Sequence, residues 1–307
     1  MKCFKIDITI QSAFATTPKG DTLFGYFCWM LAEMDGSSEL TKLLKGYTNG
    51  EPFAIFSDFL AGNRILFPPV PNAYLGIEFD PQERKAFKRK RAISIEKLNE
   101  LGNVIDKRSK EACEDISITT PKESIHMRNS LSRIIGTTGE NFDPFASKRF
   151  DLEENRGTIY VLLDTNRMSE EKFTNILNIM GKSGFGKDAT IGRGRFSVDK
   201  IEPIKWENKG YNAILTLSPS ILSGQEFKEA YYEPFTRFGK HGGLLSHGIV
   251  WKNPILMADS FALVRVENLP KFIGKGLGGD GSLSVQLYET VHQGYAIALP
   301  VLFGEKR

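Results

Sequence analysis

Hydrophobic and polar residues alternate at the start of the chain in the manner of a half-buried strand. Over residues 3–10, written CFKIDITI, the apolar side chains at even positions fall on one face and Lys5, Asp7 and Thr9 on the other. After a loop, apolar residues recur with helical spacing, and Asp21 stands where a helix N-cap is favoured. The pattern therefore predicts a strand and then a helix that buries Leu23, Phe24, Phe27, Met30, Leu31 and Met34.

Similar patterns continue along the chain. Strands are predicted around residues 53–56, 158–163 and 195–202, and residues 169–180 place their apolar side chains on one helical face. The order of helix, loop and strand over residues 169–202 fits the end of a ferredoxin-like βαββαβ unit. In the last third of the chain, strands are predicted at residues 211–217, 248–251, 260–266 and 295–303.

Residues 80–151 show little core-like periodicity apart from residues 93–101, and they are rich in charge. Six Lys and Arg side chains fall within residues 84–91, which indicates a solvated face or, alternatively, a polyanion partner. Because loops this long are functional or disordered, we interpret residues 80–151 as an insertion. The predicted fold is α+β, with two ferredoxin-like units packed together: residues 1–205, which include the insertion, and residues 206–307.

The composition is that of an ordinary globular protein, and the small net charge does not indicate a particular partner. The chain has 307 residues, 41% of them hydrophobic and 25% charged, with a net charge of +3, so it can bury one large or two medium cores. Its three widely spaced cysteines predict neither a disulfide framework nor a zinc site. No apolar run approaches the roughly 20 residues that span a bilayer, and the first residues lack a signal-peptide pattern. We therefore expect a cytoplasmic protein with no membrane partner and no bound metal.

The most distinctive segment is GKSGFGKDATIGRGRF at residues 181–196, in which five glycines alternate with Lys and Arg. Glycine lets backbone N–H groups approach a polyanion, while neighbouring cations neutralise it. Walker and dinucleotide motifs fit poorly, because Asp188 replaces the magnesium-binding Ser or Thr and because those motifs open a helix after a strand. The loop at residues 181–195 is therefore either a contact for nucleic acid or nucleotide, or a solvated surface loop. Phe185 either stacks on a base or packs beneath its own loop.

These segments, in this order, resemble the RAMP superfamily of CRISPR effector proteins, in which a glycine-rich loop joins the last helix and strand of a ferredoxin-like unit. Residues 19–31 (KGDTLFGYFCWML) resemble the first-helix motif of that superfamily. Residues 126–164 resemble the arginine-containing segment of the subunit that caps the 5′ end of the CRISPR RNA (crRNA) in type III-A Csm complexes. Residues 240–246 and 252–260 resemble its second half, whereas FPPV at residues 67–70 departs from the more basic segment expected there.

The resemblance implies a crRNA-binding subunit that holds the repeat-derived 5′ tag, contacts the large cyclase-like Csm subunit and abuts a backbone RAMP subunit. In this family a thumb-like hairpin kinks the guide, and the insertion is the candidate for it. Arg128 and Arg133 stand out, because the planar arginine fork suits a phosphate or a guanine edge. The residues expected to bind RNA are Lys19, Arg128, Arg133, Lys148, Arg149, Lys182, Gly184, Phe185, Gly186, Lys187, Arg193, Arg195, His241 and His247.

Candidate catalytic residues are few. A repeat-cleaving endoribonuclease of the same superfamily would need a general base near the first helix, and that segment contains no histidine. His241 and His247 lie in a glycine-rich segment and are candidates for a base, an RNA contact or an ordinary exposed residue. Residues 278–280 read GGD but lack the second carboxylate that two-metal chemistry needs. We predict a noncatalytic binding protein without a cofactor, with the endoribonuclease and a stand-alone nucleotide-binding protein as alternatives.

Overall fold

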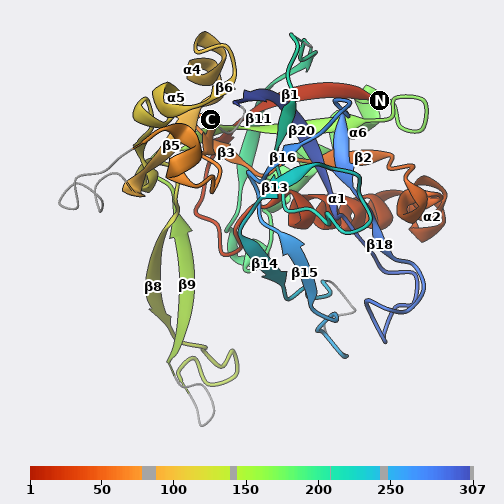
Figure 1. Cartoon of the computed structure of the whole chain (residues 1–307). Coiled ribbons are helices and arrows are strands. Elements are labelled where there is room, and N and C mark those ends of the chain that lie inside the picture. The colour runs from red at the N-terminus through yellow and green to blue at the C-terminus, as the bar shows by residue number, and fades with distance from the viewer. Residues whose placement is uncertain (78–87, 139–143, 208, 243–247, 305–307) are drawn as a thin grey trace.

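The computed structural model describes residues 1–77, 88–138, 144–207, 209–242 and 248–304 (Figure 1). Its first sheet has the strand order β11–β1–β10–β2, all antiparallel, and β3 also pairs with β10. These strands are β1 (Lys2–Ile10), β2 (Ala54–Phe56), β3 (Leu60–Ala61), β10 (Arg156–Leu163) and β11 (Phe196–Ile204). The strands predicted at the start of the chain and around residues 53–56, 158–163 and 195–202 are confirmed.

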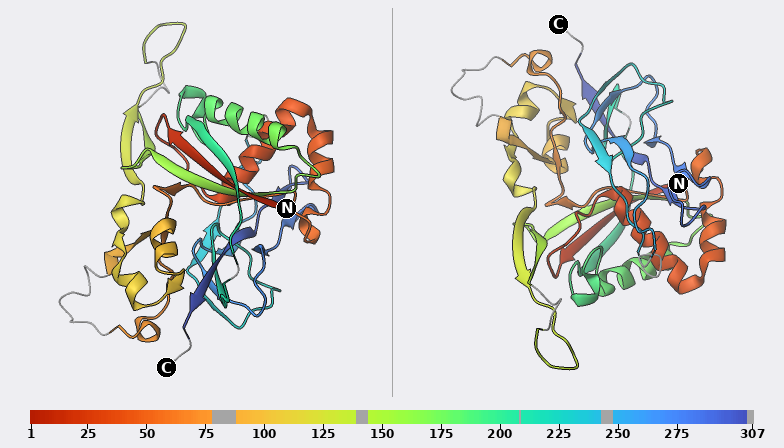
Figure 2. Two further views of the ribbon diagram at one scale, coloured as in Figure 1. Left: turned by 90° about the horizontal axis from the view of Figure 1, so that it is seen from above. Right: turned by 90° about the horizontal axis from the view of Figure 1, so that it is seen from below.

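Two long helices, α1 (Gly20–Asp35) and α6 (Glu170–Ser183), contact each other and lie together on one face of this sheet (Figure 2). With the strands they follow the order β1–α1–β2–β10–α6–β11, which is the βαββαβ order expected for the first unit. Ser169 caps α6 by accepting a hydrogen bond from the Lys172 N–H at 3.2 Å. The shorter helices of this part are α2 (Ser37–Leu44), η1 (Tyr47–Asn49) and η4 (Ala189–Ile191).

The start of α1 differs from the sequence-based expectation. Lys19 occupies the N-cap position without a side-chain cap, and Asp21 lies inside the first turn with its side chain fully buried. Asp21 instead accepts two hydrogen bonds from Arg237. A carboxylate buried without such a charged partner would strongly destabilise the fold. The apolar face of the helix is buried as predicted up to Leu31, whereas Met34 is 39% exposed.

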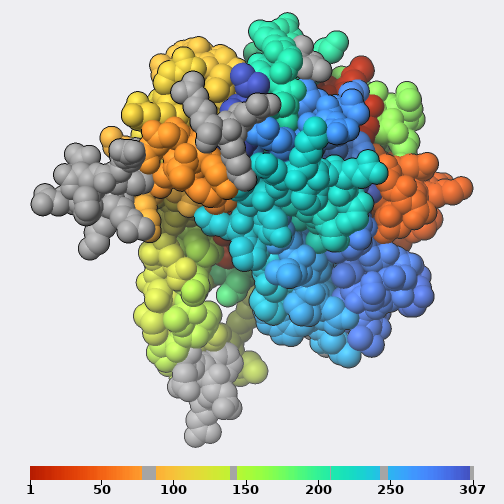
Figure 3. Space-filling view, in the orientation of Figure 1, coloured from red at the N-terminus to blue at the C-terminus, as the bar shows by residue number. Residues whose placement is uncertain are grey.

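The insertion forms a small lobe and a hairpin. The lobe contains the three-stranded sheet β4–β5–β7 with short helices, and the antiparallel pair β8–β9 projects away from the body (Figures 1 and 3). The lobe and the hairpin comprise β4 (Arg64–Leu66), η2 (Asn72–Leu75), β5 (Lys90–Ser94), α4 (Ile95–Glu100), β6 (Val104–Ile105), α5 (Lys107–Glu111), β7 (Glu114–Asp115), η3 (Ile116–Ile118), β8 (Lys122–Arg128) and β9 (Phe145–Asp151). Of these, β4 and η2 precede residue 80, so the lobe begins earlier in the chain than the predicted insertion.

The second half is built around the sheet β13–β16–β12–β20–β17, to which β6 of the insertion adds in parallel. In the described residues from 209 to 304 it contains strands and no helix. The strand predicted at residues 248–251 is wrong: Trp251 makes only an isolated bridge to Lys240, and Ile249 and Trp251 are 60% and 54% exposed. Its strands are β12 (Ala213–Thr216), β13 (Glu229–Tyr231), β14 (Pro234–Arg237), β15 (Ile255–Ala258), β16 (Leu263–Arg265), β17 (Phe272–Gly274), β18 (Leu277–Gly278), β19 (Val291–His292) and β20 (Tyr295–Phe303).

The two halves share one hydrophobic core. A single cluster of buried residues includes members from β1, α1 and β10 as well as from β12 and β20, and β2 contacts β20 directly. Across this junction the Gln293 amide exchanges two hydrogen bonds with the Phe56 backbone, at 2.9 and 2.8 Å. The helices and strands confirm the predicted mixed α+β class. The shared core shows that the two halves pack as one body.

Candidate nucleic-acid interface

The glycine-rich loop is held in place by Phe185, whose ring is 1% exposed. The ring makes edge contacts with Phe14 and Tyr26, at centroid distances of 6.0 and 5.3 Å. Of the two outcomes predicted for Phe185, packing beneath its own loop is the one that occurs. The side chain is not available to stack on a base.

The glycines of the loop allow the chain to pack closely against itself. Gly184 and Gly194 have φ values of 90° and 70°, in the left-handed region that favours glycine. A Cβ on Gly194 would lie 2.2 Å from the Phe185 carbonyl oxygen, and one on Gly184 would lie 2.3 Å from that of Arg193. These glycines are needed to fold the loop, whatever it binds.

Most backbone N–H groups of the loop have partners within the protein. The Phe185 N–H donates to Gly194 O at 2.9 Å, the Gly194 N–H to Ala13 O at 3.0 Å and the Lys187 N–H to Thr16 Oγ1 at 3.0 Å. Such groups are not free to bind phosphate. Any contact of this loop with a polyanion therefore depends mainly on its Lys and Arg side chains.

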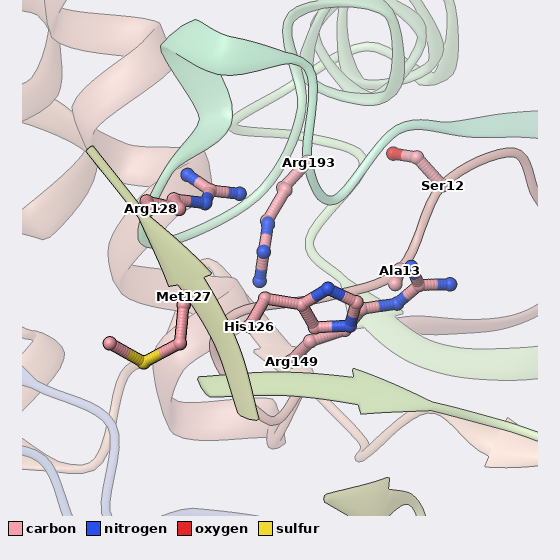
Figure 4. Close-up of a pocket in the computed structure, with 7 residues that line it drawn as sticks. All are labelled: Ser12, Ala13, His126, Met127, Arg128, Arg149 and Arg193. Atoms are coloured by element: carbon pink, nitrogen blue, oxygen red, sulfur yellow. The ribbon is translucent and has the colours of Figure 1, made fainter. Parts of the chain in front are cut away.

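The loop meets the β8–β9 hairpin beside the last three residues of β8, at a pocket of about 390 Å³. Arg193 reaches from the loop toward β8 and β9, which supply the neighbouring histidine and two further arginines (Figure 4). Guanidinium groups that converge on one open space form a natural site for an anion, because each offers several N–H donors. The pocket is lined by Ser12, Ala13, His126, Met127, Arg128, Arg149 and Arg193.

Each of these arginines also has a structural contact. Arg193 is 8% exposed and donates from Nη1 to the Lys148 carbonyl oxygen at 2.8 Å, which ties the loop to β9. Arg128 Nη1 lies 3.5 Å from Asp188 Oδ2, and Arg149 Nη2 lies 2.6 Å from Asp151 Oδ1. The sequence predicted the three arginines, and the fold brings them together from segments about 20 to 65 residues apart.

Other predicted cations lie in residues 181–195 or in the segment of the hairpin, residues 122–151. The side chains of Lys182, Lys187, Arg195 and Arg133 are exposed and have no ion pair within the described part of the chain. Lys148 is exposed and pairs with Glu123 at 2.8 Å. These five cations stay predictions for RNA contact.

Lys19 and His241 are engaged inside the protein. Burial alone would lower the pKa of Lys19, but Asp58 and Asp259, which pair with its ammonium group, raise it. His241 Nε2 lies 2.7 Å from Ser284 Oγ, and its residue is 8% exposed. Burial, with a smaller effect from Lys252, lowers the pKa of His241. Both residues are poor candidates for RNA contact, and His247 lies outside the described residues.

Three polar residues at the site were not among the predicted RNA contacts: Ser12 and His126, which line the pocket, and Asp188, which pairs with its arginines. Ser12 precedes the first helix and carries no local signal, whereas Asp188 could have been recognised as an acidic residue within a basic loop. His126 is exposed on β8, with Nε2 3.4 Å from Ser124 Oγ. Among the described residues no group of three His, Cys, Asp or Glu side chains could hold a metal ion, and no helix is long and apolar enough to cross a membrane.

Known structures share the fold of the whole chain. One match is a crystal structure of a Csm1–Csm4 cassette in complex with pppApA, at 15% identity, a TM-score of 0.60, and coverage of 99% of this chain and 100% of the other. A second cassette, with cA3, gives 15% identity, a TM-score of 0.58 and the same coverage. A Csm3–Csm4 subcomplex of a type III-A CRISPR–Cas interference complex gives 16% identity, a TM-score of 0.53 and 98% coverage of both chains.

No protein-family model and no curated protein matches the chain. The component that all three of these structures have in common is Csm4. At these identities the likeness establishes the fold, and it runs through the insertion and both halves. The chain therefore has the fold of Csm4 over almost its entire length, as the resemblance in its sequence predicted.

Proposed function

We propose that the chain is a noncatalytic RNA-binding subunit of a type III-A CRISPR effector complex, which holds the 5′ tag of the crRNA. The observation that carries this proposal is the arginine pocket between the glycine-rich loop and the hairpin, within a chain that has the Csm4 fold throughout. Arg128, Arg149 and Arg193 supply a fixed set of donors for the RNA backbone. The exposed Lys187 and Arg195 extend this positive surface along the loop.

In this proposal the chain also joins two protein partners. Csm4 occurs with Csm1 in one set of similar structures and with Csm3 in another, so partners of those two types are expected here. The β8–β9 hairpin is the candidate for the thumb that contacts the guide, because it projects from the body directly beside the arginine pocket. The first half supplies the βαββαβ unit on which the pocket is mounted. The ferredoxin-like form predicted for the second half stays a prediction, since its described residues contain strands and no helix.

The test is a reconstitution with a Csm1-type large subunit and a Csm3-type backbone subunit. With the chain present, the complex should retain tagged crRNA and recruit the large subunit; without it, recruitment and target-triggered nuclease output should fall. The purified chain alone should bind crRNA and leave it intact. Normal recruitment in its absence would refute the bridging role, and cleavage by the chain alone would refute the noncatalytic one.

One observation favours a second function, cleavage of repeat RNA. His126 lines the same pocket as the three arginines, and a histidine beside bound phosphate can act as a general base. This candidate predicts a metal-independent cut in labelled repeat RNA that His126→Ala abolishes. A cut that persists in His126→Ala would exclude His126 as the base.

A further inference from the structure

The arginines of the pocket between the glycine-rich loop and the hairpin are paired with carboxylates within the protein itself. Asp188 Oδ2 lies 3.5 Å from Arg128 Nη1 and 4.0 Å from Arg193 Nε, so one carboxylate serves two arginines. Arg149 has its own partner in Asp151. A phosphate that binds Arg128 and Arg193 must therefore compete with Asp188 or join it.

The position of Asp188 suits this role. It lies in the glycine-rich loop just before η4, and its φ of 64° is in the left-handed region that Asp and Asn tolerate better than most residues. Its Oδ2 also accepts a hydrogen bond from Ser147 Oγ on β9 at 3.1 Å. The carboxylate thus contacts both strands of the hairpin from the loop, and its side chain is only 19% exposed.

We propose that Asp188 is a positioning residue that determines which RNA the pocket accepts; this inference rests on the proposed function. Asp188 holds two guanidinium groups in a fixed arrangement and cancels part of their charge. RNA that places a phosphate into the pocket engages both arginines in that arrangement and replaces the lost ion pairs. RNA that only approaches the surface meets a partly neutralised site, so electrostatic attraction adds little to its affinity.

The test compares crRNA recovered from the reconstituted complex with poly(U) of the same length, on the full chain. Asp188→Asn retains the backbone preference and an acceptor for Ser147 while it removes the charge. The affinity for poly(U) should rise about 1.4- to 5-fold, the factor that corresponds to the ~0.2–1 kcal/mol of one ion pair near the surface. Its salt dependence should steepen by roughly 0.7 for each additional phosphate that the protein binds. The affinity for crRNA should rise less or fall, so the ratio of the two affinities decreases.

Three further variants separate positioning from a structural effect. Asp199→Asn removes an exposed charge from β11 outside the pocket and should leave the ratio unchanged. Ser147→Ala loosens Asp188 without a charge change, so it should lower the preference for crRNA without steepening the salt dependence. In an Arg128→Ala background, Asp188→Asn should change the ratio less than in the wild type, because the residue acts through the arginines.

The outcomes distinguish this inference from the proposed function. If the wild-type chain binds neither RNA, or binds both equally, the proposed function fails. If the wild type prefers crRNA and Asp188→Asn keeps both the melting temperature and that preference, only the role of Asp188 is refuted. If Asp188→Asn lowers the melting temperature, the Ser147→Ala result decides: an unchanged preference for crRNA refutes the inference, and a reduced one supports it.

Discussion

Asp21 ties the two halves of the chain together, and we predict that Asp21→Asn destabilises the whole protein. Its side chain has no exposed surface and receives hydrogen bonds from Arg237 Nε at 2.6 Å and Nη2 at 2.8 Å, while His292 Nε2 lies 3.3 Å from Oδ2. Burial alone would raise the pKa of Asp21, but His292 and Arg237 lower it well below its usual range. The group is therefore charged in the folded protein at neutral pH.

The expected loss follows from the charge that remains. Removing one member of a buried ion pair costs about 3–5 kcal/mol, because the other charge stays buried without a partner. At about 2–4 °C per kcal/mol for a chain of more than 150 residues, the melting temperature should fall by roughly 6–20 °C. The measurement is thermal unfolding followed by circular dichroism, checked by urea titration of the same variant.

The matched control is Asp199→Asn, an exposed aspartate on β11 that should change the unfolding free energy by less than about 0.5 kcal/mol. A double variant, Asp21→Asn with Arg237→Gln, should be less damaged than the sum of its single changes, since neither charge is then left alone. A shift in melting temperature of less than about 2 °C corresponds to a loss of at most ~1 kcal/mol. If Asp21→Asn gave so small a shift, this account of the junction would be refuted.

Three further predictions concern the junction and the glycine-rich loop. Burial raises the pKa of Asp58 to about 6 despite the attraction of its cationic neighbour. Between about pH 6 and pH 4 the folded state therefore holds a proton that the unfolded state lacks, so stability should rise as the pH falls through that window. Asp58→Asn should abolish this contribution in urea titrations. Gly194→Ala should lower the melting temperature, because its Cβ would lie 2.2 Å from the Phe185 carbonyl oxygen; an unchanged value would show that the loop can shift. Replacing Lys187 and Arg195 together by Ala should weaken RNA binding and reduce its salt slope by roughly 1.4, since each phosphate bound in a single strand contributes about 0.7, and an unchanged slope would show that neither touches phosphate.

The first half could be predicted from the sequence because its long elements repeat a local pattern. In β1, Phe4, Ile6 and Ile8 alternate with polar residues over the whole strand, and α6 combines an apolar face with a Ser169 cap. In such segments the apolar positions of the sequence are the positions that the fold buries. The helix-poor second half has strands of two to four residues apart from β20, which are too short for a periodicity to emerge.

The arginine pocket could be predicted only in part. Arg128, Arg149 and Arg193 were recognisable as cations in the right segments, but their convergence depends on how the hairpin docks against the loop. Asp21 shows the same limit, because its partner Arg237 is 216 positions away and no local signal links the two. Sequence patterns identify side chains that a site needs, whereas contacts between distant segments decide which of them meet.

The glycines of the loop have a structural role that their sequence pattern did not indicate. Its glycines suggested a cradle in which backbone N–H groups bind phosphate, yet the N–H groups of Phe185, Lys187 and Gly194 are bonded within the protein. The same glycines let the loop turn tightly enough to bring Arg193 and Asp188 against the two strands of the hairpin. Because these side chains reach both strands of the hairpin, the loop joins the sheet of the first half to the projecting hairpin. RNA bound at this junction would contact loop and hairpin at once, and a change in either would alter how the other meets the guide.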